Sequence, residues 1–500
     1  MHTERAGRAV RFDRETVAFG FLAALGTVFY LWRLGWSDIW IDEAFSKALA
    51  RHSLPDLLRL VAHDSHPPLY FIGLKGFTAV VGDSDFAIRL FSVLGALATL
   101  TLAFVLGRRV FGPPGALVWC ALLVALPMPG LYAHVARMYT WAAFVCVGVF
   151  LHAVLFARER RRGDLFGLGL FSAAAAYTHY YSLIAAFWID LTLLVLLVAR
   201  KERAWRGVAG LGLAVFVLYL PWLMALRSQA AAVHRDFWIP PITWASVADC
   251  YVKPFGGFYG MYGVSWLLAA LIYGLTLASV LWVFGSRRKD DRLALAFALV
   301  GVHATILTAA AVSLGFRPVL YPRYVMTIAP LLVVPPVFAL LRMRSVLARW
   351  LVLAVALVCG LYVVFSESGF SFGPYQRALQ TLAREHPEVR KVVHVNEVTA
   401  GPFHEYGRGG PWMQFYIHNA GTSWYSNMEI LAGMAAVPDV GAIADPGEVI
   451  CLVEFAGLPL NGHNLERTMA RCDVVAQVEV YDDKPYAGVL LKLHILRARP

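Results

Sequence analysis

Two adjacent carboxylates, Asp42 and Glu43, stand in a polar segment directly after the first apolar stretch of a very hydrophobic chain. Carboxylates at the edge of hydrocarbon are costly in free energy, so they are candidates for a functional role. A carboxylate held there could take a proton from a hydroxyl group as a general base. The structural alternative is that both residues merely begin a helix, because the dipole at a helix N-terminus stabilises acidic side chains. The sequence leaves both interpretations open.

A second group of polar residues lies near the ends of later apolar segments. Each could be an interfacial anchor, since Arg and Tyr favour that depth of a membrane. Together their cations, imidazoles and phenols would bind a phosphate, which needs no metal to neutralise it. We expect no required cofactor, although the sequence His63-Asp64-Ser65-His66 leaves a divalent metal as an open alternative. The candidate phosphate-binding residues are His66, Arg137, Tyr139, His179, Tyr180, Lys253, Arg323 and Tyr324.

The tripeptide Asp83-Ser84-Asp85 resembles the metal-binding motif of soluble enzymes that use nucleotide sugars. It stands immediately before an apolar span that starts at Phe86, so we expect it to cap that helix instead.

The composition places the chain in a bilayer. Of its 500 residues, 59% are apolar and only 15% are charged, whereas soluble domains carry roughly 25% charged residues. A net charge of +11 would suggest nucleic acid in a soluble protein. Here the basic residues form short clusters between apolar spans, as they do on the cytoplasmic side of membrane proteins. Cys451 and Cys472 could form a disulfide in an oxidising compartment.

The apolar segments predict an all-α polytopic membrane protein with about eleven spans. A further stretch, 67–82, is short and opens with two prolines, so we expect a half-inserted helix at the outer face. Leaving it out puts every basic cluster on the cytoplasmic side, together with the N-terminus. The expected spans are 17–34, 86–107, 114–132, 139–157, 165–179, 183–199, 207–225, 264–284, 292–314, 324–341 and 346–365.

These spans define a membrane domain, 1–366, whose first outer loop, 35–85, carries the carboxylates. Two amphipathic juxtamembrane helices are expected in that loop, one begun by Asp42 and one capped by Ser53. Residues 367–500 are richer in charges, Gly and Pro and contain apolar runs of strand length, so we expect a small extracytoplasmic α/β domain. It would select the acceptor. Trp412, Trp424 and Tyr425 could stack on sugar rings there, or pack the core of the domain.

A family resemblance follows from the order of these motifs. The chain resembles bacterial membrane glycosyltransferases of the C-type fold, in the branch with protein O-mannosyltransferases, lipid A aminoarabinose transferases and the Rgt-type sugar transferases of lipopolysaccharide. The resemblance implies a polyprenyl-phosphate sugar donor and a catalytic Asp in the first outer loop. Where many relatives carry a second carboxylate, this chain has His134-Val135. The motifs are Asp42-Glu43, His66-Pro67-Pro68-Leu69-Tyr70-Phe71, Gly82 to Leu90 with Arg89, Leu106-Gly107-Arg108-Arg109, Ala136-Arg137-Met138-Tyr139 and Pro322-Arg323-Tyr324.

We therefore expect a glycosyltransferase of a bacterial plasma membrane that moves a sugar to a hydroxyl of a glycan, glycolipid or protein acceptor. A transporter or flippase of lipid-linked or sugar substrates is the alternative. Transporters place charges at mid-membrane in broken helices, often in repeats. The charges of this chain stand mostly at span ends, which favours the enzyme.

Overall fold

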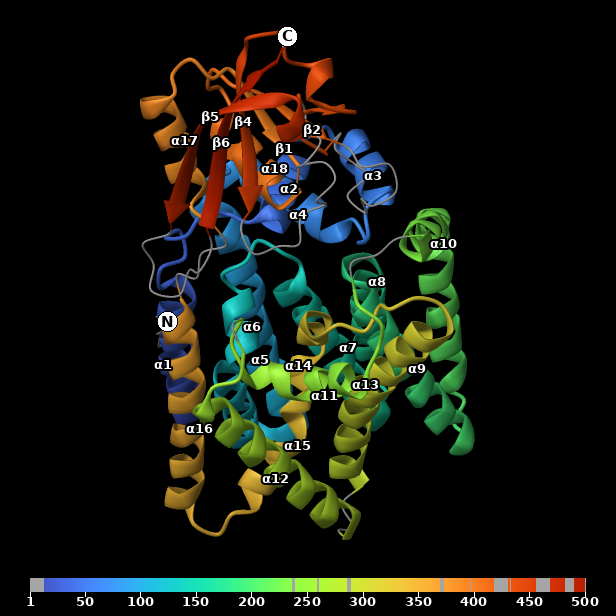
Figure 1. Ribbon diagram of the computed structural model, residues 1–500. Helices are drawn as coiled ribbons and strands as arrows, with labels where there is room; N and C mark the ends of the chain where they lie inside the picture. Colours follow the sequence, from blue (N-terminus) through green and yellow to red (C-terminus); the bar gives the residue numbers. More distant parts are fainter. Residues whose placement is uncertain are drawn as a thin grey trace, which may run out of the picture.

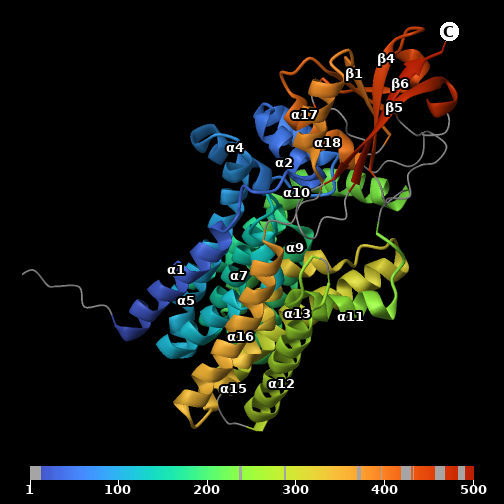
Figure 2. The ribbon, with the colours of Figure 1, turned by 60° about the vertical axis from the view of Figure 1, so that its left-hand side comes forward.

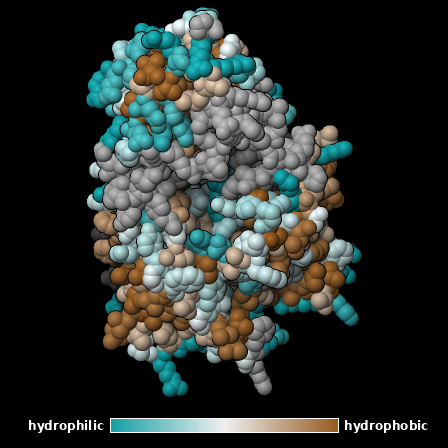
Figure 3. All heavy atoms as spheres, in the orientation of Figure 1, coloured by the Kyte–Doolittle hydropathy of each residue, from teal (hydrophilic) through white to brown (hydrophobic). Residues whose placement is uncertain are grey.

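The computed structural model describes residues 13–235, 239–258, 260–285, 289–368, 373–395, 397–417, 430–431, 433–455, 468–481 and 490–499. A bundle of long helices carries a layer of short helices and a small sheet at one end (Figure 1). Hydrophobic residues cover much of the bundle, whereas hydrophilic residues gather over the sheet (Figure 3). Trp424 and Tyr425, two of the three expected acceptor residues, lie outside the described residues.

The chain is a multi-pass membrane protein. Among the described residues, eight helices are long and apolar enough to cross a bilayer. They are α1 (Arg14–Leu31), α5 (Asp85–Val124), α7 (Tyr139–Glu159), α9 (Tyr180–Ala199), α10 (Trp205–Arg235), α12 (Gly263–Gly285), α13 (Lys289–Gly315) and α16 (Val346–Glu367). The shorter α8 (Arg162–Thr178) corresponds to one more expected span.

Helix α5 accounts for two of the expected spans, because it is interrupted at Gly112. That glycine has φ 74° and precedes two prolines, so the helix cannot continue through it. The thiol of Cys120 lies 3.5 Å from the carbonyl oxygen of Leu100, and Gly107 packs against Trp119. The two arms therefore fold back on each other as an antiparallel helical hairpin.

The tenth expected span, 324–341, is a broken helix. It consists of η2 (Pro322–Thr327), α14 (Ala329–Leu332) and α15 (Val334–Arg342). Pro330, Pro335 and Pro336 lack the amide hydrogens that a continuous helix needs. The break leaves Arg323 and Tyr324 on a 3-10 turn at the end of the segment.

The first outer loop contains the two expected short helices, α2 (Ile41–Arg51) and α3 (Leu54–Ala62). Ser53 caps α3 by accepting a hydrogen bond from the amide of Asp56 at 3.3 Å. The stretch expected to be half-inserted forms α4 (Leu69–Val81), whose 13 residues span roughly 20 Å, too short for a bilayer core of about 30 Å. Ser84 caps α5, as expected, by accepting from the amide of Ala87 at 3.2 Å.

The sheet lies beyond the last long helix, and its strand order is β3-β2-β1-β4-β6-β5. Strands β1 to β4 run parallel, and β6 pairs antiparallel with β4 and β5. The strands are β1 (Lys391–His394), β2 (Met413–Ile417), β3 (Ala435–Val437), β4 (Val449–Phe455), β5 (Cys472–Tyr481) and β6 (Leu490–Ala498). Helices α17 (Tyr375–Glu385) and α18 (Glu397–Gly407) and the turn η4 (Val440–Ala442) complete the sheet region. Cys451 and Cys472 are both free, so they form no disulfide.

The sheet region rests directly on the first outer loop, as two views show with α18 beside α2 (Figures 1 and 2). Gly401 in α18 faces Ala44 in α2 so closely that a Cβ at Gly401 would lie 3.1 Å from the Ala44 methyl. The hydroxyl of Tyr406 donates to Asp85 at 2.6 Å and accepts from the amide of Ile39 at 2.7 Å. The chain beyond the last long helix thus covers the helix that carries Asp42.

Candidate functional site

Asp42 lies in the first turn of α2. Its side chain faces the guanidinium of Arg323, a residue from near the end of the membrane region in the sequence. Its carboxylate Oδ2 is 3.3 Å from Nη1 of Arg323, and the side chain of Asp42 is buried. Nη1 of Arg137 lies 3.4 Å from the Asp42 carbonyl oxygen and 3.3 Å from the hydroxyl of Ser46. The structure thus brings together Asp42, Arg137 and Arg323, which the sequence places up to 281 positions apart.

Glu43 is fully buried and points to a different partner. Arg89 donates to both of its carboxylate oxygens, each at 2.8 Å. The amide of Ala136, in the turn before α7, donates to Glu43 Oε1 at 2.9 Å, and the amide of Trp40 donates to Oε2 at 3.3 Å. Both carboxylate oxygens of Glu43 therefore accept hydrogen bonds that hold loops in place, and Asp42 is the carboxylate of this pair that faces Arg323.

Arg89 extends this network into the turn before α2. Its Nη1 donates to the carbonyl oxygens of Leu34 and Ser37 at 3.0 and 2.9 Å, and its Nη2 donates to that of Asp38 at 3.1 Å. A buried guanidinium needs such partners, because an unpaired buried charge costs several kcal/mol. The ion pair with Glu43 therefore fixes the entry to α2 and, through it, the position of Asp42.

His66, His179 and Tyr324 form an aromatic cluster beside the arginines. The His179 ring centroid lies 5.5 Å from that of His66 and 5.3 Å from that of Tyr324, and Tyr139 lies 5.8 Å from His179. Burial, reinforced by the positive charges of Arg137 and Arg323, lowers the pKa of His179 to about 3. Burial, with the same two arginines and His179, also lowers the pKa of His66 well below its usual value. Both imidazoles are therefore neutral at physiological pH.

The neutral histidines leave polar atoms available inside the protein. Nδ1 of His179 accepts a hydrogen bond from the amide of Tyr181 at 3.1 Å, so its Nε2 carries the proton. Nε2 of His179 and Nδ1 of His66 are buried and have no hydrogen-bond partner among the described residues. Buried polar atoms of this kind normally have a partner, so a ligand is expected to supply one.

Tyr180 lines the same cavity as His66, His179 and Tyr324, whereas Lys253 lines a different one. The hydroxyl of Tyr180 donates a short hydrogen bond to Gln229, and the amide nitrogen of Gln229 donates to the Val61 carbonyl at 2.9 Å. Tyr180 thus ties α9 to α10 and α3. Lys253 begins the 3-10 turn η1 (Lys253–Phe255), which follows α11 (Trp244–Val252).

Two cavities border η2. One, of about 240 Å³, is lined by His66, His179 and Tyr324 at one end and otherwise mainly by apolar side chains of α9, α10 and α13, including Ile184, Leu226, Ala309 and Val312. The other, of about 290 Å³, is lined by polar and aromatic side chains that include Arg323 and Lys253. Consecutive residues, Arg323 and Tyr324, therefore border different cavities.

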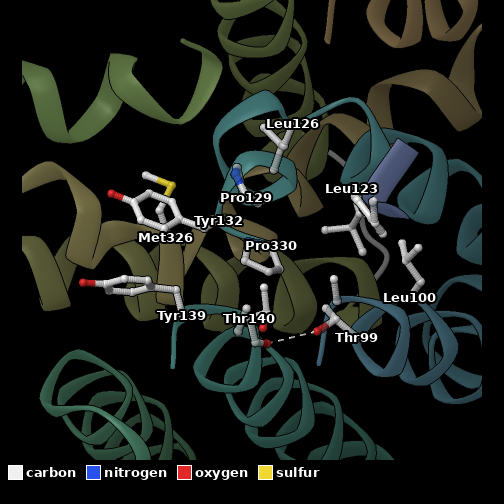
Figure 4. Close-up of a pocket in the computed structure, with 13 residues that line it drawn as sticks. Thr99, Leu100, Leu123, Leu126, Pro129, Tyr132, Tyr139, Thr140, Met326 and Pro330 are labelled. Carbon is white, nitrogen blue, oxygen red and sulfur yellow. Dashed lines mark hydrogen bonds between the residues drawn. The ribbon is translucent and has the colours of Figure 1, made fainter. Parts of the chain in front are cut away.

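A third, smaller cavity of about 40 Å³ lies between α1, α5 and α7. Tyr132, from α6 (Pro127–Tyr132), stands with Tyr139 at one end of it, and their hydroxyls point away from Leu100 and Leu123 (Figure 4). The two ring centroids are 4.7 Å apart. The two rings meet edge to face, and Tyr132 also lines the cavity that Arg323 borders.

Other expected positions lie elsewhere. Trp412 is half-buried against the core of the sheet region. Nδ1 of His63 contacts the carbonyl oxygen of Arg59 at 2.8 Å on the surface, whereas His66 is buried. No group of three His, Cys, Asp or Glu side chains is placed to share a metal within the described ranges. His134 contacts the Phe29 carbonyl oxygen at 3.1 Å.

Two kinds of residue at the site could not be singled out from the sequence. Arg89 entered only as part of a motif, although a charged residue inside an apolar span is itself a signal. The amide of Ala136 and the ring of Tyr132 carry no such signal, because an amide and a buried aromatic ring occur in every membrane helix bundle. Only the fold reveals that they contact Glu43 and border the site.

The chain matches known proteins in sequence and in fold. Residues 65–224 match the family described as dolichyl-phosphate-mannose-protein mannosyltransferase. The undecaprenyl phosphate-alpha-4-amino-4-deoxy-L-arabinose arabinosyl transferase of Pseudomonas aeruginosa (strain LESB58) is 28% identical over 245 residues. That match covers 45% of this chain and 43% of the relative, so less than half of the relative's length is matched.

Solved structures match over nearly the whole chain. ArnT from Cupriavidus metallidurans in the apo state has a TM-score of 0.64 at 15% identity, over 96% of this chain and 98% of that one. The same protein bound to undecaprenyl phosphate has a TM-score of 0.63 at 15% identity, with the same coverage. The apo oligosaccharyltransferase of Archaeoglobus fulgidus has a TM-score of 0.52 at 13% identity, over 80% of this chain and 64% of that one.

These likenesses define the class of fold. The chain has the C-type fold of membrane glycosyltransferases, with a small sheet region after the last long helix. The resemblance that its sequence motifs suggested, to the branch with protein mannosyltransferases and aminoarabinose transferases, is confirmed by the family and by the relatives it matches.

Proposed function

We propose that this chain is a membrane glycosyltransferase that moves a sugar from a polyprenyl-phosphate donor to an acceptor hydroxyl, with Asp42 as the general base. One observation carries the proposal. The buried Asp42 carboxylate contacts Arg323, which lines the polar cavity, and the next residue, Tyr324, lines the apolar one. A glycosyl lipid phosphate would need an apolar cavity for its tail, a cation for its phosphate and a polar cavity for its sugar. The likeness to transferases that use lipid phosphates supports this reading.

The reaction breaks one bond and forms another. The acceptor oxygen attacks the anomeric carbon, and its proton passes to Asp42. The bond between the anomeric carbon and the phosphate oxygen breaks, and the lipid phosphate leaves with the electron pair. Arg137 and Arg323 stabilise the charge that develops on the leaving phosphate, and their forks can each bind two phosphate oxygens. No metal is needed for this step.

Donor binding would also prepare the base. In the free enzyme Arg323 is paired with Asp42. A phosphate that enters beside Arg323 competes for the same guanidinium, which leaves the Asp42 carboxylate available to the acceptor. His179 donates from Nε2, and His66 supplies a second unpaired ring nitrogen. Glu43 acts as a positioning residue, because both of its oxygens are held by Arg89 and the loop amides.

Replacing Asp42 with Asn tests the proposal. The change keeps the shape and removes the base, so turnover should fall by about 10²–10⁴-fold, while insertion into the membrane and binding of undecaprenyl phosphate persist. The matched control is Asp56→Asn, which alters an exposed aspartate of the same loop. Transfer should be measured from radiolabelled polyprenyl-phosphate sugars. If Asp42→Asn turns over at the wild-type rate, Asp42 is not the general base and serves only to start helix α2.

The proposed orientation puts the N-terminus in the cytoplasm and residues 367–500 outside, as a separate α/β domain. The basic clusters support it. All six native cysteines are buried, so single introduced cysteines can report sidedness. An impermeant maleimide added outside should label Ala435→Cys, on the exposed edge strand β3, but not Gly163→Cys at the start of α8. Labelling of Gly163→Cys in sealed cells would reverse the orientation.

A further inference from the structure

The polar cavity that Arg323 borders has the size and the lining residues of a saccharide-binding pocket. Its volume of about 290 Å³ is close to the lower end of the range for small-molecule sites, roughly 300–1,000 Å³. Three aromatic side chains, Tyr132, Phe258 and Tyr321, line it together with one carboxylate, Asp249, and two cations, Lys253 and Arg323. Aromatic faces can cover the C–H groups of a sugar, while the charged groups bind its hydroxyls.

Helix α11 presents its polar residues to this cavity. Ser246, Asp249 and Lys253 follow one another at spacings of three and four, so they lie on one face. All three line the cavity. Trp244, at the start of the same helix, is 90% exposed. The helix lies across the bundle in both ribbon views (Figures 1 and 2). Its charged groups therefore face inward and its tryptophan outward, the reverse of a water-soluble surface helix.

The two charged side chains of α11 and η1 have no polar side-chain partner within the described ranges. An Asp followed four positions later by a Lys commonly forms an ion pair on a helix. Neither Asp249 nor Lys253 makes a side-chain hydrogen bond or ion pair with any described residue. Ser246 differs, because its hydroxyl is engaged with Thr243 in the cap of α11. Asp249 and Lys253 are thus an acceptor and a donor that a ligand can reach.

We infer that this cavity holds the transferred sugar and that Asp249, with Lys253, determines which sugar is accepted. The inference rests on the proposed function, since it needs a glycosyl phosphate whose phosphate lies at Arg323. Asp249 accepts hydrogen bonds from one or two sugar hydroxyls, and Lys253 donates to a third. A carboxylate beside an ammonium suits a sugar hydroxyl, because each hydroxyl both donates and accepts.

The charge of the cavity narrows the class of sugar. Its lining residues include two cations and a single carboxylate. With the donor phosphate at Arg323, the charged side chains left to face the sugar are Lys253 and Asp249, whose charges cancel. A neutral hexose or pentose keeps that balance, whereas a positively charged amino sugar adds an unbalanced charge. The donor should therefore carry a neutral, hydroxylated sugar, in contrast to the 4-amino-4-deoxy-L-arabinose in the name of the matched Pseudomonas aeruginosa relative.

Binding measurements separate the sugar from the lipid phosphate. The full-length protein in detergent should bind polyprenyl-phosphate mannose more tightly than undecaprenyl phosphate. Asp249→Asn should weaken binding of the mannosyl lipid by about 10–100-fold, the usual loss for a hydrogen bond to a charged group, and leave undecaprenyl phosphate within twofold. The 4-amino-4-deoxy-L-arabinosyl lipid should bind more weakly than the mannosyl lipid. Asp290→Asn, an exposed aspartate in the first turn of α13, is the matched control.

Three results would overturn the inference. They are an equal loss for bare and mannosylated lipid in Asp249→Asn, no loss for either, and no preference of the wild type for a neutral glycosyl lipid. The proposed function fails differently, through absence of transfer to any acceptor. If the mannosyl lipid binds in an Asp249-dependent way but is never transferred, the sugar site is supported and the proposed transferase activity is refuted.

Discussion

Arg323 connects the two parts of the candidate site, because it contacts Asp42 and borders the polar cavity. With His66 and His179 neutral, the positive charge available to a phosphate comes from Arg137 and Arg323. A planar guanidinium can bind two phosphate oxygens at once, whereas an ammonium acts as a point charge. The type of cation at this position should therefore matter as much as its charge.

Replacing Arg323 with Lys should weaken undecaprenyl phosphate binding by about tenfold, and Arg323→Ala by more, since a charge-assisted hydrogen bond contributes about 1.5–3 kcal/mol. Isothermal titration in detergent measures both. Arg342→Lys, which alters a half-exposed arginine paired with Asp291, should bind as wild type does. Unchanged affinity in both Arg323→Ala and Arg137→Ala would remove these arginines from the phosphate site.

At the residue scale the sequence predicted which side chains lie at the site, but not which partner each of them contacts. Asp42, Arg137 and Arg323 were expected together and are in contact. The adjacent Asp42 and Glu43 look equivalent in the sequence, yet Glu43 points to Arg89 and Asp42 to Arg323. One position along a helix turns a side chain by about 100°. The partner that each carboxylate meets then depends on the whole fold.

At the scale of the elements, Glu43 holds the N-terminal turn of helix α2 in place. Glu43 links it to α5 through Arg89 and to the turn before α7 through the amide of Ala136. Glu43→Ala should lower the free energy of unfolding by about 3–5 kcal/mol, because it leaves Arg89 buried without its counter-charge. Thermal unfolding in detergent measures the loss.

A surface ion pair of the same loop supplies the control. Asp83 pairs with Arg51 at 2.7 Å, and both side chains are partly exposed. Asp83→Asn should cost at most about 1 kcal/mol. If Glu43→Ala unfolds at the same temperature as Asp83→Asn, the buried pair is not what fixes α2.

The elements with local signals were predicted well. Helix α3 starts after Ser53, the residue expected to cap it. Helix α18 and strands β2 and β3 were not predicted. α18 contains Gly401 and Pro402, residues that lower helix propensity, and β3 has only three residues. Their structure depends on packing against α2 and on pairing with β1, which no local pattern encodes.

For the whole molecule, the contact between the sheet region and the first outer loop changes what the sheet region is expected to do. The sequence favoured a domain that selects the acceptor. The structure adds that α18 covers α2, through Gly401 against Ala44 and through an ion pair between Glu405 and Arg51. Removing 367–500 would expose this face of α2. Such a truncated protein should lose both sugar transfer and donor hydrolysis, rather than transfer alone.

A point substitution tests this coupling without the risk of unfolding. The Tyr406 hydroxyl joins α18 to Asp85 and to the Ile39 amide just before α2. Tyr406→Phe should lower kcat several-fold, because each lost hydrogen bond contributes about 0.5–1.5 kcal/mol, and leave undecaprenyl phosphate affinity unchanged. The matched control is Tyr375→Phe, whose hydroxyl donates to the Val398 carbonyl within the sheet region. If Tyr406→Phe turns over normally and the truncated protein still hydrolyses donor, α18 does not position Asp42, and acceptor selection remains the role of the sheet region.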